Sequence, residues 1–218
     1  MTAGSVGSIR TEQCGRTARN LPSPLLLIVA GPNGSGKTTL VRQGVLAAHL
    51  DVPLGSINPD DVARDLAGGG APTADISLRA AQICDGRLDD EIEAGRSVTV
   101  ETVLSSDKLK QRVETAKSVG FRVALVYVTL RHPALHVARV RQRHALGGHD
   151  VPAERVLRRR ERSHELFAWF AERADLVLVF DNTATPVYTA GKADGVWDLA
   201  ASDRLPEELA ATLRRLAG

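Results

Sequence analysis

Short, mostly apolar runs alternate along the chain with longer stretches that predict helices. The clearest runs are Leu25–Ala30, Phe121–Leu130 and Leu176–Phe180. A run that is apolar on both faces, such as Leu25–Ala30, is typical of a strand buried in a parallel sheet. Two shorter runs, Ser56–Ile57 and Ser97–Val100, predict further strands.

The stretches between these runs predict helices, and several are bounded by residues that start or stop a helix. Pro133 suits a first helical turn, and Gly95 and Gly120 are stop signals. The predicted helices are Lys37–Leu50, a capped helix from Asp60, Asp75–Ala94, Ser105–Val119, Pro133–His144, Ala153–Arg173 and Leu205–Ala217. Residues 186–199 predict a small β excursion with turns at Gly191 and Gly195.

Strands that alternate with helices predict an α/β fold, in which helices cover both faces of a mostly parallel, five-stranded sheet. The 218 residues, 43% of them hydrophobic, suit one domain with a sizeable core. We expect this domain to span residues 24–218, after a flexible leader (residues 1–23) that lacks the apolar stretch of a secretory signal. In such sheets, ligands bind beyond the carboxyl ends of the strands.

A glycine-rich phosphate loop follows the first strand and opens the next helix, which predicts a three-layer αβα P-loop NTPase fold. Residues 31–39 meet the pattern Gly-x-x-x-x-Gly-Lys-Thr, whose backbone N–H groups wrap a phosphate. Lys37 is predicted to bridge the β- and γ-phosphates of ATP, and the Thr38 hydroxyl to ligate Mg²⁺. The predicted ATP-binding residues are Gly31, Pro32, Asn33, Gly34, Ser35, Gly36, Lys37, Thr38 and Thr39.

Polar residues at two further strand ends are candidates for the acceptor side of the site. Phosphoryl transfer to an alcohol needs a carboxylate that takes the hydroxyl proton, and Asp60 is the best-placed catalytic base, with Asn58 beside it to orient a substrate. The alternative is that Asp60 only caps the following helix, unless Asp61 is the cap. Glu101 and Thr102 end another strand. For Glu101 we consider three roles: it binds substrate hydroxyls, it holds Mg²⁺ through water, or it is only a solvated strand end.

An arginine-rich segment is the predicted lid, over about residues 144–162, with a glycine pair at positions 147–148. Between positions 136 and 164 stand Arg139, Arg141, Arg143, Arg155, Arg158, Arg159, Arg160 and Arg162. Most such arginines are solvated, yet mobile arginines neutralise the charge on a transferring phosphate. The candidates for that contact are Arg143, Arg158, Arg159 and Arg162. His149, in the same loop, either caps the loop or contacts substrate phosphate.

Composition and charge narrow the range of partners. The net charge is only +2 and aromatic residues are 4%, so no nucleic-acid surface is indicated. No apolar run approaches the roughly 20 residues of a membrane span, so no membrane partner is expected. Cys14 and Cys84 fit no metal spacing, and we expect free thiols in a reducing cytoplasm.

A series of motifs follows in order between about Leu25 and Asn182. They are Ala-Gly-Pro-Asn-Gly-Ser-Gly-Lys-Thr-Thr (30–39), Asn-Pro-Asp-Asp-Val-Ala (58–63), Val-Glu-Thr-Val-Leu-Ser (100–105), Gly-Gly-His-Asp-Val-Pro (147–152), Arg-Arg-Arg-Glu-Arg-Ser (158–163) and Phe-Asp-Asn (180–182). The series resembles the zeta toxin family and its close relatives, the UDP-N-acetylglucosamine kinases. Two positions depart from the family pattern. The family often has Thr where this chain has Val103, and it commonly has an aromatic residue where this chain has Arg160.

The resemblance implies an ATP- and Mg²⁺-dependent kinase that phosphorylates the 3′-hydroxyl of the N-acetylglucosamine in UDP-N-acetylglucosamine. In this comparison Lys37 and Thr38 serve ATP–Mg²⁺, Asp60 is the base, and Glu101 and Thr102 lie on the substrate side. Arg143 and one of residues 158–162, taken as Arg159, match the arginines that neutralise phosphate. The resemblance also implies an antitoxin protein as partner, for which this chain carries no recognisable segment.

Three other functions stay open at the level of the sequence. One is a P-loop kinase for another small hydroxyl compound, such as an antibiotic, a nucleoside or another nucleotide-linked compound. Another is an ATP-binding regulatory module without transfer, against which Lys37, Asp60 and the lid arginines argue. A nucleic-acid kinase is the weakest, because it predicts steeply salt-dependent binding that a near-neutral chain gives little reason to expect.

Overall fold

The computed structural model describes residues 23–42, 46, 56–68, 70–145 and 151–218. Its elements, in chain order, are β1 (Leu25–Ala30), α2 (Lys37–Arg42), β2 (Ser56–Ile57), α3 (Pro59–Leu66), α4 (Ala74–Glu93), β3 (Val98–Thr102), α5 (Lys108–Ser118), β4 (Arg122–Thr129), α6 (Pro133–Ala145), α7 (Ala153–Arg173), β5 (Leu176–Asp181), β6 (Val187–Ala193), β7 (Val196–Asp198), a 3₁₀ turn (Ser202–Arg204) and α8 (Glu207–Ala217).

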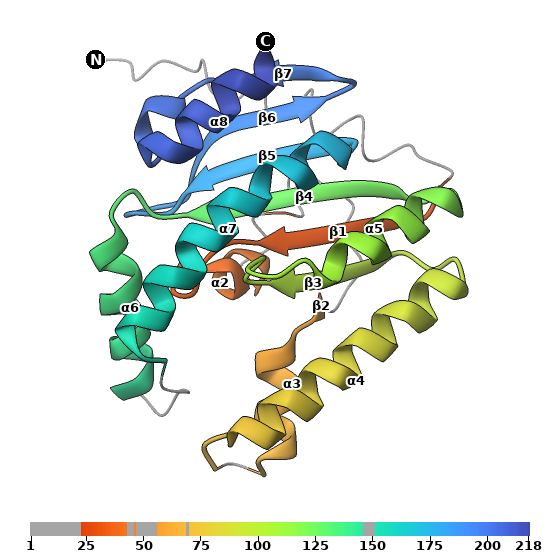
Figure 1. Ribbon diagram of the computed structural model, residues 1–218, viewed down its shortest axis with the longest axis vertical. Helices are drawn as coiled ribbons and strands as arrows, with labels where there is room; N and C mark the ends of the chain where they lie inside the picture. The colour runs from red at the N-terminus through yellow and green to blue at the C-terminus, as the bar shows by residue number, and fades with distance from the viewer. Residues whose placement is uncertain (1–22, 43–45, 47–55, 69, 146–150) are drawn as a thin grey trace.

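One sheet organises the molecule, with strand order β2-β3-β1-β4-β5-β6-β7. The first five strands in that order run parallel, and β6 and β7 are added antiparallel at one edge. Figure 1 shows the strands side by side, with α5 and α7 lying across one face of the sheet. The predicted α/β P-loop fold is therefore confirmed, with the phosphate loop following the central strand β1.

The predicted strand count of five is wrong, because the β excursion joins the main sheet and brings the number to seven. The predicted turn at Gly191 is also wrong, because this residue lies inside β6, opposite Leu178 and Asp198. A Cβ atom at Gly191 would lie 2.6 Å from the Val177 carbonyl oxygen, so glycine is required for close packing. The turn at Gly195 is confirmed, with φ of +77°.

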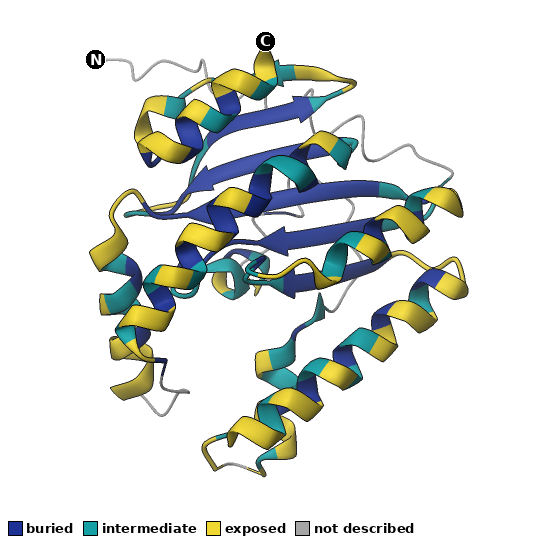
Figure 2. Ribbon diagram, in the orientation of Figure 1, coloured by how far each residue is buried: buried dark blue, intermediate teal, exposed yellow. Residues whose placement is uncertain are grey.

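Alternate residues of the central strands enter two separate cores. Leu26 and Ile28 of β1 face a large core that α4, α5, α7 and α8 cover. Leu27 and Val29 face the opposite layer, with Leu40 of α2. This alternation explains why β1 is apolar on both faces. Figure 2 shows the result, with buried strands between helices whose outer faces are exposed.

Two helices extend from the edge of the sheet beyond β2 and β3 (Figure 1). α3 and α4 pack against each other, and α4 joins the main core through Leu88 and Ile92. Cys84 is buried in α4 as a free thiol, as the sequence predicts. Among the described residues, no helix combines the length and the apolar character needed to cross a membrane.

Two segments named in the sequence analysis lie outside the described residues. They are most of the predicted leader (residues 1–22) and the central part of the predicted lid (residues 146–150), which includes His149. The helix predicted to run from Lys37 to Leu50 is described only as far as Arg42, and Leu46 beyond it is buried.

Candidate active site

The phosphate loop connects β1 to α2 and depends on glycine at two close approaches. Gly31 has φ of +143°, and a Cβ atom there would lie 2.0 Å from the Val128 carbonyl oxygen. Gly36 has φ of +93°, and its Cβ atom would lie 2.2 Å from Asn182 Nδ2. Side chains at these positions would disrupt the loop, because both the backbone angle and the space exclude them. The motif therefore has a structural reason in addition to its phosphate-binding one.

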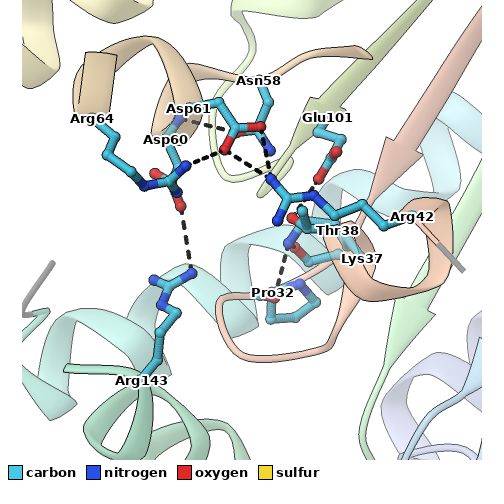
Figure 3. A network of polar contacts seen from close by, with 11 residues as sticks. Pro32, Lys37, Thr38, Arg42, Asn58, Asp60, Asp61, Arg64, Glu101 and Arg143 are labelled. Carbon is cyan, nitrogen blue, oxygen red and sulfur yellow. Dashed lines mark hydrogen bonds and ion pairs between the residues drawn. The ribbon is translucent and has the colours of Figure 1, made fainter. Parts of the chain in front are cut away.

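The ammonium group of Lys37 lies against the loop itself. Its Nζ donates to the Gly31 carbonyl oxygen at 2.7 Å and to the Pro32 carbonyl oxygen at 3.2 Å (Figure 3). Burial lowers the pKa of Lys37 to about 8, and the nearby Glu101 and Asp60 carboxylates partly oppose that shift. A phosphate bound in the loop would supply further negative charge to this partly buried cation.

Glu101, at the end of β3, lies beside the P-loop threonine. Its Oε2 accepts a hydrogen bond from the Thr38 hydroxyl at 2.7 Å, and its Oε1 accepts one from the Ser56 hydroxyl at 2.9 Å (Figure 3 shows the Thr38 contact). Glu101 is 5% exposed, so the alternative of a solvated strand end is wrong. The structure brings the predicted Mg²⁺ ligand and the predicted strand-end acid into direct contact.

This pair fits a magnesium ion held together with a nucleotide. Mg²⁺ prefers a few protein oxygens plus phosphate oxygens and waters, and Thr38 and Glu101 supply a hydroxyl and a carboxylate at one point. The described residues contain no cluster of three or more His, Cys, Asp or Glu side chains suited to a metal. Mg²⁺ bound with a nucleotide usually keeps several waters and takes phosphate oxygens as further ligands.

Asp60 begins α3 without serving as its cap. The N-cap is Asn58, whose side-chain Oδ1 accepts from the Asp60 backbone N–H at 2.9 Å, and Pro59 takes the first helical position. Both cap alternatives raised by the sequence, Asp60 and Asp61, are thus wrong. Asn58 is buried at 6% exposure and is used for the cap, so the Asp60 carboxylate is directed into the cleft.

The carboxylate of Asp60 faces a guanidinium across the cleft. Arg143 Nη1 of α6 lies 3.5 Å from Asp60 Oδ2 (Figure 3). Arg159 of α7 also lines the cleft, and burial lowers its pKa, with Arg155 adding to that shift. Both arginines chosen from the sequence for phosphate neutralisation therefore lie at the site.

Three other arginines of the lid segment lie elsewhere. Arg162 pairs with Asp107 at 2.9 Å, and Arg160 is buried against Glu208 at 2.8 Å. Arg158 is exposed and does not line the cleft. The arginines along α7 therefore lie on different faces of the helix, because neighbouring residues on a helix point in different directions. Only some of them face the cleft.

The cleft has a volume of about 960 Å³ and joins all of these groups. One end is lined by the phosphate loop and by Ala184–Pro186 after β5. The other end is lined by Asp60, by Thr102 and by the turn that follows β3. In that turn, the Thr102 hydroxyl accepts from the Leu104 backbone N–H at 3.0 Å, and Leu104 has a φ of 60°.

Sequence reasoning missed three residues that hold the phosphate loop from outside the motif. Asn182 Nδ2 donates to the Ser35 carbonyl oxygen at 2.8 Å. Arg139 Nη2 donates to the Asn182 carbonyl oxygen at 2.9 Å. His136, buried in α6, contacts the Asn33 carbonyl oxygen through Nδ1 at 2.9 Å. The sequence could have indicated Asn182 as a site residue, because it follows a strand end. It could not have indicated His136, because a histidine in an amphipathic helix gives no such indication.

Burial keeps His136 neutral, because desolvation lowers its pKa to about 4. A neutral imidazole carries one N–H, and the carbonyl of Asn33 can only accept, so Nδ1 is the donor. His136 thus acts as a hydrogen-bond donor under the phosphate loop and not as a charged group.

The comparison with protein families matches residues 26–166 to the family described as AAA domain. The chain belongs to the AAA domain family. A relative with 30% identity over 130 residues is an uncharacterized protein of Haemophilus influenzae. The match covers 60% of this chain and 88% of the relative.

Solved structures share the fold at low sequence identity. The AvrRxo1-ORF1:-ORF2 complex with ATP matches with a TM-score of 0.63 and 16% identity, over 95% of this chain and 80% of that one. The PezAT chromosomal toxin–antitoxin system of Streptococcus pneumoniae matches with a TM-score of 0.60 and 15% identity, over 99% and 88%. At these identities the likeness shows the P-loop kinase fold alone.

Proposed function

We propose that this protein is an ATP-dependent kinase that transfers the γ-phosphate to a hydroxyl group of a small molecule. One observation carries the proposal: Lys37, the Thr38–Glu101 pair and the Asp60 carboxylate all line one cleft. The P-loop alone supports nucleotide binding. A carboxylate across the cleft, unoccupied by helix capping, adds the group that an alcohol acceptor requires.

The chemistry assigned to each residue follows from its position. The acceptor oxygen attacks the γ-phosphorus, the bond to the β-phosphate oxygen breaks, and Asp60 takes the hydroxyl proton. Lys37 neutralises the β- and γ-phosphates, leaving the carbonyl oxygens of Gly31 and Pro32. Arg143 and Arg159 neutralise charge on the transferring group. Thr38 and Glu101 would hold Mg²⁺, which would supply further neutralisation when bound with ATP.

Arg143 Nη1 lies 3.5 Å from Asp60 Oδ2. Its transfer to the γ-phosphate would leave the Asp60 carboxylate available to the acceptor hydroxyl. ATP binding would therefore prepare the base as well as the donor.

For the acceptor, we propose the 3′-hydroxyl of the N-acetylglucosamine in UDP-N-acetylglucosamine. The motifs that resemble those of the zeta toxin family support this choice, and so does the presence of Asp60 and Glu101 in one cleft. Charge also supports it: Asp61 holds Arg42 at 3.2 Å and Arg64 at 2.7 Å at the acceptor end (Figure 3). Two guanidinium groups sharing one carboxylate keep a net positive charge, which suits a diphosphate.

A cytoplasmic location follows from this proposal, because ATP and UDP-sugars are its substrates. We also propose a protein partner of the antitoxin kind. Support comes from the solved structures named above, which are a toxin–antitoxin system and a two-component complex.

An acceptor panel tests the proposal. The protein is incubated with ATP, Mg²⁺ and, separately, UDP-N-acetylglucosamine, other UDP-sugars, nucleosides and aminoglycoside antibiotics, and ADP release is followed. We expect UDP-N-acetylglucosamine to give the largest increase over the rate without acceptor. If only a different hydroxyl compound raised the rate, that compound, and not UDP-N-acetylglucosamine, would be the acceptor. Tight ATP binding with no acceptor-dependent turnover would favour a regulatory module.

A further inference from the structure

Glu101 is a buried carboxylate whose two oxygens are both held by hydroxyl groups. Thr38 donates to one oxygen at 2.7 Å, and Ser56 donates to the other at 2.9 Å. The Thr38 contact belongs to the P-loop motif and is explained by it. The Ser56 contact comes from β2, a strand of two residues with no such motif.

We propose that Ser56 is a positioning residue, which holds Glu101 in the orientation that lets Thr38 and Glu101 bind the divalent cation of the nucleotide together. The inference rests on the proposed binding of a metal–ATP complex in this cleft. A threonine hydroxyl that donates its proton to a carboxylate keeps its lone pairs free for a cation. Hydrogen bonds to a ligating carboxylate fix its orientation, and their loss typically weakens metal binding.

The strand register shows that the Ser56 contact is selective. Ser56 lies directly opposite Thr99 of β3, and Glu101 follows two residues later, on the same face as Thr99. The Thr99 hydroxyl is buried and makes no hydrogen bond. Ser56 therefore reaches past its register partner to the carboxylate, although a hydroxyl acceptor lies beside it.

The charges near Glu101 show what the contact prevents. The Lys37 ammonium group is partly buried and is attracted to the Glu101 carboxylate. Without Ser56, one carboxylate oxygen would be buried with no donor, which carries a free-energy cost. Rotation of the carboxylate toward the Lys37 ammonium group would relieve that cost. It would also remove Glu101 from Thr38 and engage the lysine that the phosphates need.

The same contact links the two halves of the cleft. β2 leads directly into Asn58, the cap of α3, and then to Asp60. Ser56 therefore ties the strand that carries the proposed base to the carboxylate of the metal site.

Binding of Mn²⁺, a paramagnetic substitute for Mg²⁺, tests the proposal without any acceptor. The Mn²⁺ affinity of the protein–ATP complex is measured by electron paramagnetic resonance, and metal-free ATP affinity is measured in EDTA by calorimetry. For Ser56→Ala we expect Mn²⁺ affinity to fall roughly tenfold. We expect metal-free ATP affinity to stay within about twofold, because the phosphate loop is intact. Ser56→Thr keeps a hydroxyl on a residue suited to a strand and should restore Mn²⁺ affinity.

Thr99→Val is the matched control, because it removes a neighbouring buried hydroxyl that has no partner. It should leave Mn²⁺ affinity unchanged. The proposal is overturned if Ser56→Ala binds Mn²⁺ normally, if Thr99→Val loses as much affinity, or if Ser56→Thr fails to recover it. Failure of the proposed function looks different: no acceptor would stimulate ATP turnover, while the metal affinities of these variants would still differ as stated.

Discussion

At the scale of single residues, Asp60 stands at the start of α3 but does not cap that helix. A carboxylate at the start of a helix is commonly its cap, but Asn58 makes the capping hydrogen bond here. The sequence Asn-Pro-Asp therefore separates two roles: the amide stabilises the helix, and the carboxylate two positions later faces the cleft.

The Asp60→Asn variant should keep ATP binding and lose transfer. Removal of a general base lowers turnover by roughly 10²–10⁴-fold. Asp65→Asn is the control, because Asp65 is exposed on the same helix and does not line the cleft. Turnover with the best acceptor and the affinity for an ATP analogue are the two measurements. Normal turnover in Asp60→Asn would remove Asp60 as the base.

Lys37 predicts a pH dependence of nucleotide binding. Its pKa of about 8 lies below the ordinary value of 10.5, so the free protein loses this positive charge as the pH rises through about 8. Affinity for a non-hydrolysable ATP analogue should therefore decline between pH 7 and 9.5, with proton uptake on binding. Lys37→Arg keeps its charge throughout this range and should bind with a flat pH profile, even if more weakly. A flat profile in the unaltered protein would contradict the account.

At the scale of elements, α7 presents different chemistry on its two faces. Arg159 lines the cleft, whereas the adjacent Arg160 is buried and pairs with Glu208 of α8. His164, one turn later, contacts the same carboxylate through Nδ1 at 3.2 Å. The helix that places a cleft arginine is thus anchored by an ion pair to the C-terminal helix.

Replacement of Glu208 tests this anchor. Glu208→Gln leaves the Arg160 side chain, 6% exposed, without its carboxylate. Breaking a buried pair costs about 3–5 kcal/mol, and since Glu208 is itself half-exposed we expect about 2 kcal/mol in the free energy of unfolding. Glu207→Gln is the matched control, because its partner Arg214 is exposed and surface pairs contribute about 0–1 kcal/mol. Urea unfolding measures both, and equal losses would refute the anchoring role.

The sequence predicts the buried parallel strands of the sheet well, but it does not reveal that β6 joins the same sheet at its antiparallel edge. β1, β4 and β5 are visible as apolar runs because both of their faces are buried. β6 carries Thr189 and Lys192 in buried positions, and these polar residues hide its membership of the sheet. The Lys192 ammonium donates to the carbonyl oxygens of Ala171 and Glu172 at the end of α7, a partner that no local pattern reveals.

The candidate site likewise contains residues that the sequence predicts and residues that it does not. The residues of the phosphate loop, Asp60 and Glu101 could be found from the sequence, because they lie at or just after strand ends. Ser56, Arg139 and His136 could not, because their role is to orient other groups through contacts between distant segments. The predicted contact of His149 with substrate stays a prediction, since that residue lies outside the described part of the chain.

At the scale of the whole molecule, the cleft joins the proposed nucleotide and acceptor ends of the site at the carboxyl ends of the parallel strands. β1, β2 and β3 each end at this edge and deliver the phosphate loop, the Asp60 turn and Glu101. α6 and α7 supply Arg143 and Arg159 from the opposite side. The fold therefore explains why residues more than one hundred positions apart line one cleft.

The most direct test of the central claim is the fate of the labelled γ-phosphate of ATP in the presence of Mg²⁺ and UDP-N-acetylglucosamine. The account predicts that the label appears in the sugar nucleotide on a hydroxyl group of the sugar, and that Asp60→Asn abolishes this transfer. Label found only in ATP or in free inorganic phosphate, with every hydroxyl acceptor of the panel equally unmodified, would contradict it.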